Sequence, residues 1–91
     1  GRHANRMADK LVAAVRASND VRLAWETGSN QIFLIMTDAK AASLRAAGAR
    51  FYEWATPAGM EHLVGENEQI RRFITSFATR EEDVDMIANL F

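Results

Sequence analysis

The chain has 91 residues, of which 48% are hydrophobic and 25% charged, and its formal net charge is −1. This length suits one packed domain and is too short for two, and the charge balance argues against a surface that binds nucleic acid. The chain has no cysteine, which excludes disulfides and thiolate chemistry, and it has no apolar stretch long enough for a membrane span.

The first half of the chain predicts a helix, two strands and a short second helix. In chain order these elements are residues 4–18, 21–25, 31–36 and 38–47. Apolar residues at helical spacing define the first helix, and a turn at residues 28–30 joins the two strands in a hairpin. Asp38 is predicted to cap the second helix, and Gly48 to adopt the left-handed conformation that ends it.

The second half predicts two more strands, at residues 50–54 and 70–77, and a last helix after Thr79. The connection at residues 55–69 is irregular and long for a small domain, with a helical turn around residues 60–64. Thr79 and Glu82 have the spacing of a capping box for the last helix. We therefore expect an α+β domain of two layers, in the order α-β-β-α-β-β-α, with helices on one face of a three- to four-stranded, mainly antiparallel sheet.

Two of the predicted strands carry apolar side chains on both faces. On the fourth strand, Ile70, Arg72 and Ile74 share one face, and Phe73, Thr75 and Phe77 share the other. Since three helices cover only one face, we expect them on Phe73 and Phe77, and we expect the face of Ile70, Arg72 and Ile74 to be poorly covered by helices. Such a face fits central strands that are apolar on both sides, a dimer, or contact with protein outside this chain.

Residues that could support catalysis are few. His3, at the start of the chain, and His62, in the irregular connection, are too isolated to predict a metal site. The three carboxylates at residues 81–83 begin the last helix, where they complement its dipole. Lys10 and Lys40 are expected to be solvated rather than to bind a carbonyl group covalently.

Arg71 and Arg72 are the residues with the strongest claim to a function. As consecutive strand residues they point to opposite faces of the sheet. Arg72 lies between Ile70 and Ile74 on an apolar face, where its charge needs a partner. An arginine can hold a carboxylate through two parallel hydrogen bonds, so the partner of Arg72 is either an internal acid or a bound carboxylate. For Arg71 we expect a structural or solvated role.

Most of the chain also shows a family resemblance. The segments that carry it are residues 44–54 (LRAAGARFYEW) and 72–85 (RFITSFATREEDVD), with weaker similarity at 3–11 (HANRMADKL) and 30–33 (NQIF). They are similar to the C-terminal small domain of low-specificity L-threonine aldolases. These enzymes are aspartate-aminotransferase-like (fold type I) and use pyridoxal phosphate. The connection at residues 55–69 departs from the family.

The resemblance implies that residues 1–91 are one small C-terminal domain of a longer enzyme. Pyridoxal phosphate and its lysine would belong to a large domain absent from this chain. The enzyme would cleave L-threonine or L-allo-threonine and similar β-hydroxy amino acids to glycine and an aldehyde, as a cytoplasmic homotetramer. The family arginine that binds the substrate carboxylate falls on Arg72, and no catalytic, cofactor or metal residue is implied here.

Two functions of other classes also fit the pattern. One is a ferredoxin-like regulatory module that binds a small molecule, and the other is an interaction domain that dimerises through its apolar sheet face. If the resemblance holds, the 91-residue chain by itself is expected to be inactive.

Overall fold

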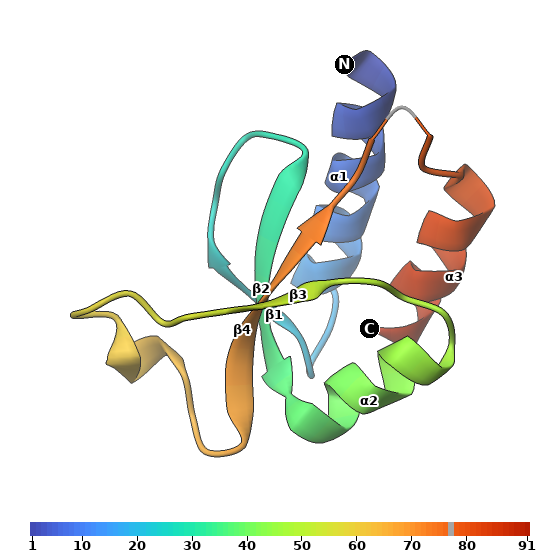
Figure 1. The fold of residues 1–91 in the computed structure, drawn as a ribbon. Helices are drawn as coiled ribbons and strands as arrows, with labels where there is room; N and C mark the ends of the chain where they lie inside the picture. Colours follow the sequence, from blue (N-terminus) through green and yellow to red (C-terminus); the bar gives the residue numbers. More distant parts are fainter. Residues whose placement is uncertain (77) are drawn as a thin grey trace.

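Three helices pack on one face of a four-stranded antiparallel sheet in the computed structural model, which describes residues 1–76 and 78–91 (Figure 1). The elements in chain order are α1 (Arg2–Arg16), β1 (Arg22–Trp25), β2 (Gln31–Thr37), α2 (Asp38–Ala46), β3 (Tyr52–Trp54), a 3₁₀ turn η1 (Glu61–Leu63), β4 (Glu68–Ile74) and α3 (Glu81–Leu90). The predicted fold class and order of elements are confirmed, as is the short helical turn in the long connection.

The strands lie in the order β1-β2-β4-β3, and every neighbouring pair is antiparallel. β2 and β4 form the centre of the sheet and pair along their whole length, from Gln31 opposite Ile74 to Thr37 opposite Glu68. β3 is an edge strand that pairs with β4 alone. β4 begins two residues earlier than predicted and ends at Ile74, and Phe77 lies outside the described residues.

The main core lies between the helices and the sheet. Its largest fully buried side chains are Met7, Leu34, Met36 and Leu44. Phe73 belongs to this core and stacks on Phe51 with ring centroids 4.6 Å apart. The expectation that the helices cover the face of Phe73 is therefore confirmed.

The opposite face of the sheet carries a second, smaller cluster, made by Phe33, Ile35 and Ile70. No described helix covers it, but the connection between β3 and β4 folds back over one end, where Leu63 and Val64 pack against the cluster. In Figure 1 this connection, drawn in yellow, lies away from the three helices. Ile70 is thus fully buried although no residue of α1, α2 or α3 belongs to its cluster, whereas Ile74, at the other end of the face, is 45% exposed.

The hairpin contains an irregularity that the sequence pattern does not indicate. Alternation predicts that Leu23 and Trp25 share a face, but the register of β1 shifts between them, so that Leu23 lies opposite Leu34 and Trp25 opposite Phe33. Such a bulge adds one residue to a strand and reverses the side on which the following residues point. Trp25 therefore joins the cluster of Phe33 instead of the main core.

The helix starts differ from two predictions. α2 is capped by Thr37, whose hydroxyl accepts from the Lys40 N–H at 3.1 Å, and Asp38 is its first residue. α3 begins after Arg80 without a side-chain cap, and the Thr79 hydroxyl instead accepts from the Ser76 N–H at 2.8 Å. The predicted capping box is therefore wrong, because Thr79 closes the preceding turn. Gly48 has φ +103°, as predicted for the end of α2.

An ion pair fastens the connection to the sheet. Arg22 Nη2 lies 2.7 Å from Glu68 Oε1 and donates at 2.7 Å to the Leu63 carbonyl. The Arg22 guanidinium, followed by the Gly65 N–H, lowers the pKa of Glu68 to about 2.

This pair predicts a loss of stability in acid. A carboxyl group whose pKa is lowered on folding stabilises the fold above its unfolded pKa, near 4.3, and this contribution disappears as the pH falls towards 2. Because Arg22 is half exposed, we expect Glu68→Gln to lower the free energy of unfolding by only about 1–2 kcal/mol at pH 6. Urea unfolding at pH 6 and pH 2 measures this, and a deficit that persists unchanged at pH 2 would contradict it.

Candidate carboxylate-binding site

The two neighbouring arginines of β4 lie on opposite faces of the sheet, as predicted. Arg71 is in register with Leu34, whose side chain is in the main core, and Arg72 is in register with Phe33, in the smaller cluster. Directly opposite residues of paired strands point to the same side. Arg71 therefore points towards the helices and Arg72 towards the opposite face.

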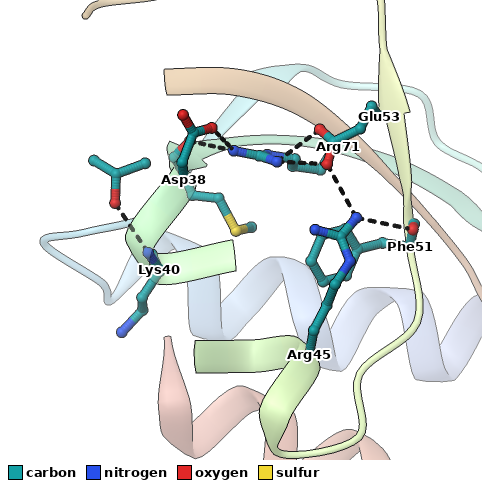
Figure 2. A network of polar contacts seen from close by, with 8 residues as sticks. Asp38, Lys40, Arg45, Phe51, Glu53 and Arg71 are labelled. Atoms are coloured by element: carbon teal, nitrogen blue, oxygen red, sulfur yellow. Dashed lines mark hydrogen bonds and ion pairs between the residues drawn. The ribbon is translucent and has the colours of Figure 1, made fainter. Parts of the chain in front are cut away.

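Arg71 makes internal ion pairs (Figure 2). Its side chain is 3% exposed, its Nη1 donates to both carboxylate oxygens of Glu53 at 2.6 Å, and its Nη2 donates to Asp38 Oδ1 at 2.7 Å. The expected structural role of Arg71 is thus confirmed, and the solvated alternative is wrong. The sequence left open an internal ion pair for Arg72, but in the structure Arg71 makes the internal ion pairs.

Arg72 is flanked by aromatic rings. Its Cζ lies 5.0 Å from the ring centroid of Trp54 and 5.5 Å from that of Tyr52. Both distances are within the range of cation–π attraction. Phe33, in register with Arg72, meets the Trp54 ring edge-on at 5.2 Å. We call Phe33, Tyr52 and Trp54 the aromatic frame of Arg72.

The charge of Arg72 has no acidic partner within the described residues. It forms no ion pair with them, and its Nε, like that of Arg71, is buried without a hydrogen-bond partner. A buried donor that lacks a partner costs free energy. A guanidinium group held between rings can satisfy such donors with a carboxylate in a planar, two-point pair.

The aromatic frame was not identified from the sequence, although the alternation of residues on the third strand indicates part of it. Tyr52 and Trp54 alternate with Glu53 on the third strand, so both had to share a face. The missing information was that this strand pairs with β4, in register with Arg72.

The two lysines do not fit the role of a cofactor-binding residue. Lys10 Nζ lies 2.6 Å from Glu81 and 2.7 Å from Asp85, and hydrogen bonds to these acids raise the pKa of Lys10. Attack on a carbonyl group needs a neutral amine, which a raised pKa disfavours. Lys40 Nζ lies 3.9 Å from Asp20.

The histidines also show no catalytic arrangement. His3 lies in α1, where its Nε2 donates to the Thr79 carbonyl at 2.6 Å. His62 lies in η1. In the described part of the chain no three histidine or acidic side chains form a group that could hold a metal ion, and no helix there is long and apolar enough to cross a membrane.

A cavity of about 360 Å³ lies on the helix side of the sheet, between β4, α3 and the turn after α2. Leu11, Phe73, Val84 and Ile87 form its apolar part. Arg72 does not line this cavity. Arg72, in register with Phe33, lies on the other face of the sheet.

Comparison with known proteins gives a match among the solved structures. No family model matches the sequence, and no curated protein does. Among solved structures, a threonine aldolase from Leishmania major matches with a TM-score of 0.78 and 31% sequence identity. The match covers 97% of this chain but only 23% of that one, so the chain spans less than a quarter of the length of the structure it matches.

Proposed function

We propose, from the confirmed resemblance of this chain to a threonine aldolase domain, that residues 1–91 form the small domain of a larger threonine aldolase. The enzyme would cleave L-threonine, L-allo-threonine or similar β-hydroxy amino acids to glycine and an aldehyde. The observation that supports a substrate-binding role for this domain is the environment of Arg72. This cation lies within an aromatic frame and has no acidic partner among the described residues.

Arg72 would bind the carboxylate of the amino-acid substrate. Two N–H groups of its guanidinium fix both the position and the plane of the carboxylate. Trp54 and Tyr52 limit the movement of the guanidinium and exclude water from one side of it, which strengthens the ion pair. Arg72 would thus hold the substrate in a fixed orientation, without a chemical step by the residue itself.

The cofactor would be bound outside this chain. Pyridoxal phosphate provides the electron sink for cleavage of the carbon–carbon bond, and the ion-paired lysines of this chain do not suit it. We assign the cofactor to a large domain of the same enzyme. We propose that this domain, or another subunit of a homotetramer, covers the exposed end of the sheet face near Tyr52 and Ile74. These two side chains are 64% and 45% exposed.

The test is the activity of the longer enzyme that contains this chain. We expect it to release glycine and acetaldehyde from L-threonine or L-allo-threonine when loaded with pyridoxal phosphate, and a coupled assay for acetaldehyde measures this. An enzyme that binds the cofactor but cleaves no β-hydroxy amino acid would disprove the proposal.

The 91-residue chain alone should not bind pyridoxal phosphate covalently. Hydrogen bonds to Asp85 and Glu81 raise the pKa of Lys10, which makes its amine a poorer nucleophile at neutral pH. Absorbance spectra and mass spectrometry after mixing test this, with free N-acetyl-lysine as the control. A stable one-to-one adduct at Lys10 or Lys40 that cleaves L-threonine would show that the cofactor site lies in this chain.

A further inference from the structure

The strand that provides two rings of the aromatic frame has few contacts of its own. β3 has three residues, lies at the edge of the sheet, and pairs with β4 alone. All three residues are exposed, Tyr52 to 64%. A short edge strand with few ladder hydrogen bonds is easily displaced. Something else must therefore hold Tyr52 and Trp54 at a constant distance from Arg72.

The middle residue of β3 is held from the helix side. Glu53 is in register with Arg71, and both of its carboxylate oxygens accept from Arg71 Nη1 at 2.6 Å. Glu53 Oε1 also accepts from Arg45 Nη2, of α2, at 3.0 Å. Charge-assisted hydrogen bonds are stronger than neutral ones, and the 3% exposure of Arg71 protects one of these pairs from water.

The same network of contacts extends to α2 and to the residue before β3. Arg71 also pairs with Asp38, at the start of α2, and Arg45 donates at 3.4 Å to the Phe51 carbonyl just before β3 (Figure 2). Arg45 additionally lies over the Phe51 ring, 4.0 Å from its centroid. Glu53 is thus the point where β3 is attached to the central strand and to α2.

We propose that Glu53 is a positioning residue for the carboxylate site. Side chains alternate along a strand, so the attachment of Glu53 on one face fixes Tyr52 and Trp54 on the other, beside Arg72. Glu53 touches neither the substrate nor Arg72 and acts through the strand. The inference rests on the proposed function of Arg72.

Asp38 provides a matched control. It pairs with the same buried arginine, at 2.7 Å, but belongs to α2 and not to β3. Glu53→Ala and Asp38→Asn each leave Arg71 with one carboxylate, so both keep the buried charge paired. Only Glu53→Ala releases β3.

The first measurement is steady-state kinetics of the longer enzyme with L-threonine. Glu53→Ala should raise KM about 10-fold with kcat within about twofold, because the carboxylate anchor acts equally on the substrate and the transition state. Glu53→Gln, which keeps an acceptor oxygen, should recover part of the loss, and Asp38→Asn should leave both constants within about twofold. An equal rise of KM in Glu53→Ala and Asp38→Asn would overturn the proposal, as would an unchanged KM in Glu53→Ala.

The second measurement uses NMR on the 91-residue chain, which has only two tryptophans. The indole N–H resonance of Trp54, assigned with the help of Trp25→Phe, should shift and broaden in Glu53→Ala and stay in place in Asp38→Asn. If Arg72→Ala leaves KM for L-threonine unchanged, the carboxylate assignment fails, and the Trp54 resonance still decides whether Glu53 positions the frame. An unmoved Trp54 resonance in Glu53→Ala would overturn the proposal.

Discussion

Replacing Arg72 by alanine in the longer enzyme should lower kcat/KM for L-threonine by between about 30-fold and several thousandfold. The variant loses a charge-assisted, two-point pair with the substrate carboxylate, which contributes about 2–5 kcal/mol, and each 1.4 kcal/mol corresponds to about a factor of ten. Steady-state kinetics measures the loss. The absorbance of bound pyridoxal phosphate should change little, because the cofactor is assigned to another domain.

Two further variants make this result specific. Arg72→Lys should recover only part of the activity, since an ammonium group cannot reproduce the planar fork of the guanidinium. Arg22→Ala removes a half-exposed arginine that pairs with Glu68, and it should cost little activity. Arg71→Ala is unsuitable as a control, because Arg71 is buried in the ion pairs that hold β3. Near-normal efficiency in Arg72→Ala, or loss of fold and cofactor together, would show that the anchor is elsewhere.

The largest expected effect on stability comes from removing both acids that face Arg71. The double variant Asp38→Ala/Glu53→Ala leaves a guanidinium whose side chain is 3% exposed without either carboxylate. Leaving a buried charge without its partners costs about 3–5 kcal/mol, a large part of the stability of a small domain. Urea unfolding of the 91-residue chain at neutral pH measures the difference.

Arg71→Met is the matched control for this effect. It removes the buried charge itself, and the two acids that remain are substantially exposed, at 66% for Asp38 and 41% for Glu53. Replacing a buried ion pair by an apolar side chain of similar length is often neutral, so we expect a change within about 1–2 kcal/mol of the wild type. A double variant as stable as Arg71→Met would mean that water reaches Arg71 in the folded chain.

Features that depend only on residues adjacent along the chain could be predicted from the sequence. Alternation along β4 correctly placed Arg71 and Arg72 on opposite faces of the sheet. The turn at Gly48 was also predicted, since its positive φ is a local property. The cap of α3 was predicted wrongly, because the spacing of Thr79 and Glu82 indicates a capping box, whereas the Thr79 hydroxyl accepts from the Ser76 N–H and α3 has no side-chain cap.

The sequence by itself therefore determined the order of the elements, the two-sided character of the central strands, and the opposite directions of the two arginines. Only the tertiary structure decided which arginine has an internal partner. The reason is physical: the direction of a side chain follows from the two-residue period of its own strand, whereas its partners depend on which strand lies beside it. The insertion of β4 between β2 and β3 places Glu53 against Arg71, and Tyr52 and Trp54 beside Arg72.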